Sequence, residues 1–383
     1  MDMCREMTES PGKPEMPGGK PGEGYGDFME ELSAPMRLLA SREALLLWYE
    51  ENKRDLPWRR DRDAYRIWIS EIMLQQTRAA AVIPYYFRFM EHFPSVLALA
   101  SKDEEELLKC WEGLGYYSRA RNLKKTAVIL AERYGGKLPA SYRELLALPG
   151  IGSYTAGAIA SIAYDIPAPA VDGNVLRVLS RVTGSREDIL KASTKKKMEE
   201  LASVLLIKGE AGTVNQALIE TGAVVCIPNG QPICAECPFF SVCAAREKGL
   251  IGQIPVKAPK KKRKIEEKTV LLLRYKDKIA IRKRSGDGLL ASLYEFVSLS
   301  GKLTKEEAGE AIGTDAAAVE AGEAKHIFSH VEWHMCGYLI ELSRLPGRLP
   351  EDVFFAEWEE LKDRYPIPNA FSVYRKFLEE RFG

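Results

Sequence analysis

Four closely spaced cysteines are the residues of this 383-residue chain whose types and spacing point first to chemistry. Cys226, Cys234, Cys237 and Cys243 are separated by seven, two and five residues. Thiolates gathered in this way ligate either an iron-sulfur cluster or a tetrahedral zinc ion. In a reducing compartment such a group is a metal site more often than a disulfide framework, so we expect a metal site. The cysteines that stand apart are expected to be free thiols: Cys4, Cys110 and Cys336.

An acidic residue within an apolar helical stretch is the second chemical feature. Glu71 interrupts a run of apolar residues between Ile67 and Met73. Burial there would desolvate its carboxyl group and raise its pKa, so that the group could hold a proton near neutral pH and act as a general acid. The alternative is a structural acid in a buried ion pair with an arginine, for example Arg54.

A glycine-rich turn precedes a second acidic residue. Gly150 and Gly152 flank one aliphatic residue and open a helix of small residues. This pattern predicts a hairpin whose free backbone amides and helix N-terminus bind an anion, for which a DNA phosphate is the natural candidate. An ordinary turn between two helices would have the same pattern. Asp172 follows downstream between an apolar residue and a glycine, where it could also be a simple helix cap.

The elements that position these residues fall into two predicted domains. Residues 8–26 are rich in Pro, Gly, Glu and Lys, and residues 1–35 are predicted to be a disordered tail. Apolar residues recur at helical spacing over 36–250, which predicts an all-helical domain that includes the cysteine loop 226–243. A basic, proline-containing linker over 251–267 leads to an α+β domain over 268–383. In that domain the pattern predicts strands over 269–274, 278–282 and 334–342 and a helix over 305–312.

Composition and charge narrow the class of protein. The chain is 46% hydrophobic and 28% charged, which is typical of a globular protein with enough apolar mass for two cores. Its net charge is only +1, so any binding of nucleic acid must depend on local basic patches. The N-terminus does not resemble a signal peptide, and no apolar run approaches the roughly 20 residues that span a bilayer. We therefore expect a cytoplasmic protein, associated with the nucleoid when bound to DNA and with no membrane partner.

The hairpin, the aspartate and the cysteine loop, in this order, resemble the helix-hairpin-helix DNA glycosylase superfamily with its iron-sulfur loop. The segments 54–59, 68–77 and 113–123 are similar to the MutY-type adenine DNA glycosylases, and the resemblance extends from Glu43 to Cys243. It implies a monomer that acts on double-stranded DNA, removes adenine opposite 8-oxoguanine or guanine, and leaves an abasic site. It also favours one 4Fe-4S cluster over zinc, although the first cysteine interval has seven residues where the family usually has six.

The resemblance also implies roles for single residues. Glu71 would protonate adenine at N7, and Asp172 would stabilise the oxocarbenium-like sugar. Tyr154 stands where strand-cleaving relatives have a lysine nucleophile, so a monofunctional enzyme is expected, with the tyrosine packed near the sugar and Asp172. Asn174 would orient the carboxylates. Arg54 and Gln216 are expected to contact the extruded adenine, and Gln76 and Tyr116 to act as wedges in the duplex. Further contacts with substrate DNA are expected from Thr77, Gly150 and Gly152. Phosphate contacts are expected from the basic residues of the helix that follows Tyr117: Arg119, Arg121, Lys124 and Lys125.

The second domain carries its own resemblance. The segments 288–296 and 328–330 are similar to the Nudix-like C-terminal domain of the MutY family, which reads 8-oxoguanine. Segment 306–313 lacks the paired-glutamate pattern that pyrophosphohydrolases of this fold need. Lesion recognition without hydrolysis is therefore expected, with Phe328, Ser329 and His330 at the lesion and Ser329 as its hydrogen-bonding partner.

Other functions remain open from the sequence. A thymine glycosylase acting on T opposite G also has tyrosine in the hairpin helix, but normally lacks the second domain. A non-catalytic DNA-damage binder and a zinc-stabilised regulator are the alternatives from other functional classes.

Overall fold

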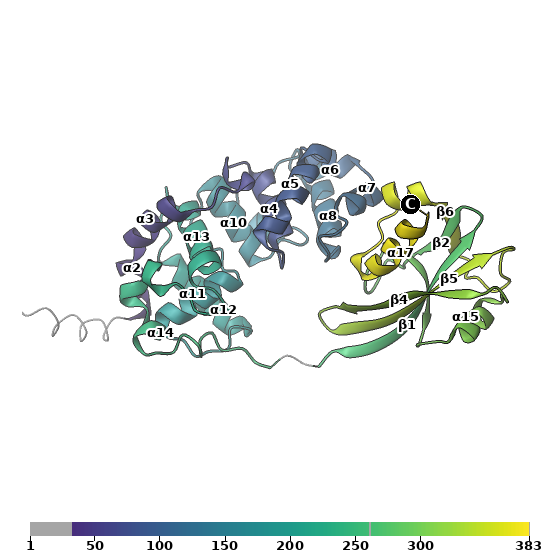
Figure 1. The fold of residues 1–383 in the computed structure, drawn as a ribbon. Coiled ribbons are helices and arrows are strands. Elements are labelled where there is room, and N and C mark those ends of the chain that lie inside the picture. The colour runs from purple at the N-terminus through teal and green to yellow at the C-terminus, as the bar shows by residue number, and fades with distance from the viewer. Residues whose placement is uncertain (1–32, 260–261, 383) are drawn as a thin grey trace, which may run out of the picture.

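The computed structural model describes residues 33–259 and 262–382, and it consists of a helical domain followed by a domain built on a β-sheet (Figure 1). The all-helical and α+β predictions are both confirmed. Most of the predicted tail and part of the basic run, Lys260 and Lys261, lie outside the described residues. Helix α2 begins at Ala34, two residues before the predicted start of the helical domain. No helix among the described residues is long and apolar enough to cross a membrane.

The helical domain is assembled from short helices whose apolar faces form two separate cores. The first core includes Trp68, Phe89 and Trp111, and the second includes Leu45, Leu179 and Phe239. Its helices are α2 (Ala34–Ala40), α3 (Arg42–Asn52), α4 (Ala64–Leu74), α5 (Ala79–His92), α6 (Val96–Ser101), α7 (Glu104–Cys110), α8 (Ser118–Arg133), α9 (Tyr142–Leu146), α10 (Ser153–Tyr164), α11 (Gly173–Thr183), α12 (Ala192–Ser203), α13 (Ala211–Glu220) and α14 (Ala244–Glu247), with short turns η1 (Pro57–Arg59), η2 (Thr221–Val225), η3 (Cys234–Glu236) and η4 (Phe240–Val242).

The boundaries of three of these helices bring the chemical residues together. Helix α4 starts where the Asp63 carboxylate accepts a hydrogen bond from the Arg66 amide, and α11 starts in the same way at Asp172. Helix α10 follows a turn in which Gly150 has φ +74°, and a side chain there would lie 2.6 Å from Cβ of Asn122. Glycine is therefore required in this turn both by backbone conformation and by space.

The second domain is a six-stranded mixed sheet with helices on both faces. Its strand order is β4-β5-β1-β3-β2-β6, in which β1 and β5 are parallel and the other neighbouring strands are antiparallel. One core lies under the C-terminal helices and the other under α15. The elements are β1 (Lys264–Tyr275), β2 (Lys278–Lys283), β3 (Tyr294–Ser300), α15 (Lys305–Ile312), β4 (Ala318–Ile327), β5 (Val331–Leu342), β6 (Val353–Glu357), α16 (Trp358–Asp363), η5 (Asn369–Phe371) and α17 (Ser372–Phe382).

The predicted strands and helix of this domain are confirmed, with longer strands than the sequence indicated. Strand β1 begins at Lys264, within the predicted linker, because it pairs along its whole length with β5. Side chains over 318–327 are mostly exposed, so β4 lacks the apolar alternation that would have revealed it.

The two domains touch where α7 and the turn that follows it meet α16 and α17 (Figure 1). The loop between β2 and β3 inserts Leu293, which is fully buried in the first helical core, and Leu290 packs against the same core. The segment 288–296 that resembles the MutY family therefore makes part of the interdomain contact.

Candidate active site

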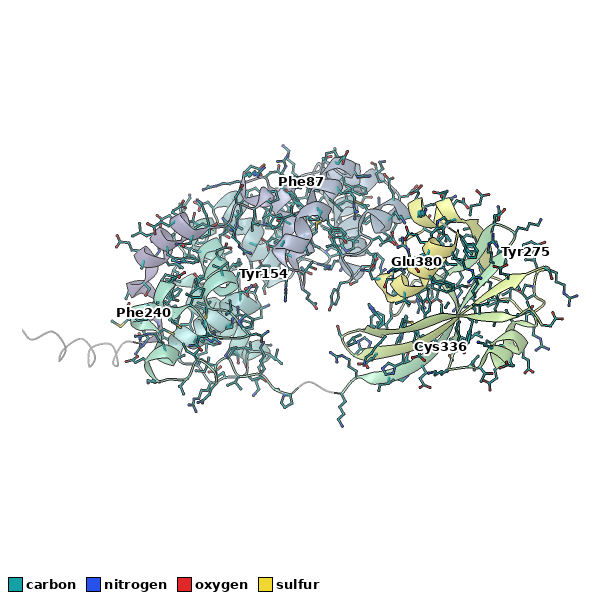
Figure 2. All side chains as sticks on the ribbon, in the orientation of Figure 1. Phe87, Tyr154, Phe240, Tyr275, Cys336 and Glu380 are labelled. Atoms are coloured by element: carbon teal, nitrogen blue, oxygen red, sulfur yellow. The ribbon has the colours of Figure 1, made fainter. Side chains whose placement is uncertain are left out.

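A cavity at the junction of the two helical cores is lined by all four predicted catalytic residues. Glu71 comes from α4, Tyr154 from α10, and Asp172 and Asn174 from the start of α11. Tyr154 is labelled within the helical domain in Figure 2. The same cavity is also lined by five of the residues predicted to contact substrate DNA: Arg54, Gln76, Thr77, Gly152 and Gln216. Gly150 and Tyr116 do not line this cavity.

Glu71 is a buried acid whose carboxylate is held by a tyrosine hydroxyl. The residue is 7% exposed, and its carboxylate accepts a hydrogen bond of 2.5 Å from the Tyr154 hydroxyl. The pKa of Glu71 is raised to about 7, mainly by burial. The Tyr154 hydrogen bond acts to lower this pKa, and the nearby charge of Asp172 acts to raise it. The side chain is thus poised to hold and release a proton near neutral pH. The alternative pairing with Arg54 does not occur, because Arg54 binds another carboxylate.

Tyr154 is held as a neutral hydrogen-bond donor. Burial and the adjacent charges of Glu71 and Asp172 raise the pKa of Tyr154 well above its usual range. Its hydroxyl donates to Glu71, and Tyr154 also lies close to Asp172, as the sequence predicted. The tyrosine therefore connects the helix of the hairpin with the helix that carries the acid.

Asp172 combines a capping role with exposure to the cavity. Its carboxylate accepts hydrogen bonds from the amides of Asn174 and Val175 at 2.9 and 2.8 Å and from the Asn174 side chain at 2.8 Å. Burial raises the pKa of Asp172, while these three hydrogen bonds lower it. The Asn174 side chain is itself held, because its oxygen accepts a bond of 2.9 Å from Arg177. Helix capping and a chemical role are therefore compatible at this residue.

A second buried carboxylate organises the arginines of the site. Glu220 is fully buried, and its two oxygens accept hydrogen bonds from Arg54 at 2.6 and 2.9 Å and from Arg59 at 2.7 Å. Burial alone would raise the pKa of Glu220, but the two arginines lower it to about 2. Sequence reasoning missed Glu220 and gave Arg59 no role. The signal was available, since Glu220 ends an apolar helix one turn after Gln216, as Glu71 interrupts another.

Gln216 lies between this arginine cluster and the second helical core. Its side-chain oxygen accepts a hydrogen bond of 3.2 Å from Tyr49, and its amide group donates to the Gly212 carbonyl at 3.3 Å. The Arg59 guanidinium stacks on the Tyr49 ring with 5.7 Å to the centroid. Arg54 and Gln216 thus line one wall, and both are already held by protein partners.

The two predicted wedge residues lie on two tight turns, and Arg119 forms hydrogen bonds with both turns. Gln76 and Tyr116 are both exposed and have φ of 60° and 48°. The buried guanidinium of Arg119 donates to the carbonyls of both turns, at 2.8 Å to Gln75 and 3.0 Å to Gly115. It also donates to the carbonyls that end α4, at 2.7 Å to Ile72 and 2.8 Å to Met73.

The prediction that α8 presents a free basic face to DNA phosphates is wrong for three of its four cations. Arg119 is buried, Arg121 donates to the Ala291 carbonyl at 2.6 Å, and Lys124 donates to the Ala100 carbonyl at 2.7 Å. These three cations therefore satisfy backbone carbonyls of the protein and do not form a free surface for phosphates. Lys125 is exposed, in agreement with a surface position. Helical spacing alone does not tell a solvated cation from one that spans an interface.

The hairpin over 148–152 leaves donor groups at the start of α10. Gly152 is the N-cap residue and supplies no side-chain hydrogen bond to the first turn. The neighbouring Ser153 hydroxyl donates to Glu199 at 2.8 Å and accepts from Lys195 at 3.0 Å. A helix N-terminus beside a lysine is an arrangement that favours an anion.

The four loop cysteines are free thiols that line one cavity. Its walls are otherwise mainly apolar and include Val178, Pro232 and Phe240. Over the described ranges 33–259 and 262–382, no three His, Cys, Asp or Glu side chains are grouped closely enough to hold a metal ion. A donor set of four thiols spread around an apolar cavity fits a group larger than one ion. Cys110 and Cys336 are free, as predicted, and the structure shows that both are buried; Cys4 lies outside the described residues.

Two arginines of α11 tie the cysteine loop to the cavity that holds Glu71. Arg177 contacts Asn174 and donates to the Cys226 carbonyl at 2.7 Å. Arg181 donates to the Cys226 sulfur at 3.2 Å and to the Ile254 carbonyl at 2.8 Å. Both guanidinium groups are buried. The loop therefore supports the helix whose first residue follows Asp172.

The predicted lesion-contacting residues form the tip of the hairpin between β4 and β5. Ser329 and His330 are exposed, while the Phe328 ring packs against His326 and Trp333, at 4.6 and 4.8 Å between ring centroids. The Phe328 amide donates to the Val331 carbonyl at 2.8 Å, which closes the turn. Phe328 anchors the tip, and the two polar residues remain accessible.

Two known families match the two domains in order. The family described as "HhH-GPD superfamily base excision DNA repair protein" matches residues 69–205, and the family described as "NUDIX domain" matches residues 269–379. The adenine DNA glycosylase of Mus musculus is 32% identical over 449 residues, which cover 99% of this chain and 87% of that protein. The adenine DNA glycosylase of Buchnera aphidicola subsp. Schizaphis graminum (strain Sg) is 34% identical over 313 residues, which cover 80% of this chain and 89% of that protein.

Among solved structures, a thermostable thymine-DNA glycosylase superimposes with a TM-score of 0.50 and 30% sequence identity. The match covers 97% of that protein but only 55% of this chain. It therefore leaves a large part of this chain without a counterpart.

Proposed function

This chain belongs to the adenine DNA glycosylases, hydrolases of N-glycosyl bonds in base excision repair, and we propose that its substrate is adenine opposite 8-oxoguanine or guanine. The observation that carries the mechanism is the buried Glu71 with a pKa raised to about 7, in one cavity with Asp172. Enzymes that break a glycosidic bond need one protonated and one ionised carboxyl group, and different surroundings provide the two states.

In the first step, Glu71 donates its proton to N7 of the extruded adenine. The bond between C1′ and N9 then breaks, and its electron pair leaves with the base. Asp172 stabilises the positive charge that develops on the sugar, electrostatically or through a transient covalent bond. Water adds to C1′ and returns a proton to Glu71, which leaves an abasic site.

The proposed enzyme is monofunctional, because Tyr154 cannot act as an amine nucleophile. Its raised pKa keeps the hydroxyl protonated and bonded to Glu71. Strand cleavage through an imine would need an amine in this place. Lys195 also lines the cavity, but it donates to Ser153 beside the hairpin.

Extrusion of adenine costs a few kcal/mol and requires that the gap in the duplex be filled. We assign the wedge to Gln76 and Tyr116, which project from two turns in left-handed backbone conformations. The amides at the start of α10 would hold a phosphate of the same strand. In the second domain, exposed Ser329 and His330 would contact 8-oxoguanine from the tip of the β4–β5 hairpin.

For the cysteine loop we propose one 4Fe-4S cluster, held by the four thiolates that line its cavity. When bound, the cluster supplies no step of base hydrolysis and serves to order the loop. Arg177 and Arg181 of α11 both bind Cys226 of the loop, and Arg177 also binds Asn174. An ordered loop would therefore hold α11, and with it Asn174 and Asp172, in place. Zinc would require the four sulfurs to converge on one ion, in tetrahedral geometry at about 2.3 Å.

The test is a single-turnover incubation with end-labelled duplexes that carry A opposite 8-oxoguanine or T opposite G, each divided into samples with and without hot alkali. The proposal expects cleavage at adenine only, and only after alkali. Glu71→Gln and Asp172→Asn should each abolish it. Cleavage at thymine would support the second candidate, a thymine glycosylase, and binding without cleavage would support a damage-binding protein. Visible charge-transfer absorption of the purified protein distinguishes the cluster from zinc.

A further inference from the structure

The turn that carries Tyr116 is one of the places where the second domain meets the helical domain. It connects α7 with α8 and has positive φ at Gly113, Gly115 and Tyr116. A side chain at Gly113 would lie 2.2 Å from the Tyr85 hydroxyl, so Tyr85 also packs closely against the backbone of the turn. Few residues tolerate this conformation, which makes the direction of Tyr116 sensitive to what holds the turn.

The second domain holds this turn at two adjacent residues. The Glu112 carboxylate forms an ion pair with Arg375 of α17 and a second one with Lys109 at 2.7 Å. The Asn369 side chain donates to the Gly113 carbonyl at 3.3 Å. The Glu112 side chain is 13% exposed and that of Arg375 is 32% exposed, so the pair is only partly screened by solvent.

The helical domain holds the other side of the turn through Arg119. Its buried guanidinium reaches the carbonyls of Leu114 and Gly115, at 3.3 and 3.0 Å, and the ring of Tyr116, at 5.7 Å from the centroid. It makes no ion pair with any carboxylate in the described part of the chain. Its remaining bonds reach the carbonyls at the end of α4, the helix of Glu71. The turn is thus linked on one side to the second domain and on the other to α4.

We infer that Arg375 and Asn369 of the second domain are positioning residues for the Tyr116 wedge, so that the domain proposed to read the lesion also sets the direction of the wedge. This inference rests on the proposed role of Tyr116. It adds a task to the second domain that lesion contact alone does not require. Neither Arg375 nor Asn369 needs to touch DNA for this purpose.

Loss of Arg375 should leave the domains docked. The contact is anchored independently by Leu293, which is buried in the first helical core, and by the bond from Arg121 to Ala291. A second interdomain ion pair joins Lys283 to Glu105 at 2.5 Å. Glu105 lies at the start of α7, whereas the Tyr116 turn follows the end of that helix, so Lys283→Met is a matched control that also removes one interdomain ion pair.

The first measurement compares the full-length protein with Arg375→Met, Arg375→Lys and Lys283→Met. In an Asp172→Asn background, 2-aminopurine beside the 8-oxoguanine reports unstacking of the duplex on binding. Single-turnover excision is measured in the same variants with Asp172 unchanged. We expect Arg375→Met to lower the fluorescence gain and to slow excision about fivefold, a factor comparable with the strength of one partly exposed ion pair. Arg375→Lys should recover most of both, and Lys283→Met should change neither.

A double-mutant cycle separates positioning of the wedge from a general effect on the protein. If Arg375 acts through Tyr116, Arg375→Met should slow the Tyr116→Ala protein no further. Equal effects of Arg375→Met and Lys283→Met, or an undiminished effect of Arg375→Met in Tyr116→Ala, would overturn the inference. A Tyr116→Ala protein that unstacks and excises as well as the unmodified one would instead overturn the proposed wedge itself.

Discussion

The pH dependence of adenine excision is the sharpest consequence of the Glu71 environment. Burial raises the pKa of Glu71 from 4.5 to about 7, and the mechanism requires the protonated carboxyl group. The rate should therefore be high below pH 7 and should fall as the pH rises through about 7. At low pH a second decline is expected as Asp172, whose pKa is also raised by burial, takes up a proton.

The size of the effect follows from the same shift. A pKa that rises from 4.5 to about 7 corresponds to roughly 3 kcal/mol against ionising the buried carboxyl group. With a midpoint of about 7, about nine-tenths of the molecules hold the proton at pH 6 and about one-tenth at pH 8. Excision should therefore be roughly tenfold faster at pH 6 than at pH 8, and above pH 8 the rate should fall about tenfold for each further pH unit.

The assay is single-turnover excision with enzyme in excess, stopped with hot alkali, so that product release and DNA affinity do not enter the rate. Tyr154→Phe provides the internal comparison. The Tyr154 hydroxyl bonds to the carboxylate and lowers the pKa of Glu71, so its removal should move the midpoint to higher pH. The midpoint is independent of any overall loss of rate in this variant.

Three outcomes would refute this account of Glu71. One is a rate that does not change between pH 6 and pH 8, and another is a midpoint that moves to lower pH in Tyr154→Phe. The third is residual excision in Glu71→Gln that keeps the same pH dependence, since the titrating group would then lie elsewhere.

Three further predictions concern groups that support the site. Glu220→Gln should destabilise the helical domain by about 2 kcal/mol in urea unfolding at neutral pH, because it removes the fully buried carboxylate that binds Arg59, which is 14% exposed, and Arg54, which is 40% exposed. The matched pH check is that the loss shrinks as the pH falls towards about 2, the lowered pKa of Glu220. Arg119→Lys should slow excision by roughly tenfold or more in the single-turnover assay, because an ammonium group lacks the planar fork that reaches both turns; a rate equal to the unmodified protein would exclude a positioning role. Cys237→Ser should lose the visible absorption of the purified protein and lower its melting temperature, whereas unchanged absorption would place the chromophore elsewhere.

The chemical residues were visible in the sequence because their types are unusual in their places. A carboxyl group in an apolar helix, two glycines around one aliphatic residue and four close cysteines each depart from what packing alone would select. Local pattern also predicted the class of both domains and the positions of β1 and β2, which adjoin in sequence and pair through Tyr275 and Lys278. These features depend on neighbours in the chain, which a sequence contains directly.

Partners of charged side chains were not predictable in this way. Arg119, Arg121 and Lys124 occupy helical positions that resemble a solvated basic face, yet each satisfies carbonyls from distant segments. Arg54 was predicted to face adenine and is bound to Glu220, which lies far along the chain. A long side chain can reach several surfaces, and its preference is decided by which unpaired carbonyl or carboxylate the fold brings near.

The sequence by itself determined which groups are available for the chemistry: an acid in apolar surroundings, an aspartate at a helix start, and a tyrosine where an amine would change the reaction. Only the tertiary structure decided their protonation and direction. The pKa of Glu71 depends on burial between two helical cores and on Tyr154 and Asp172, which reach it from other helices. Likewise, the contact of the second domain with the Tyr116 turn depends on how two separately folded cores dock, because that contact joins residues remote in the chain.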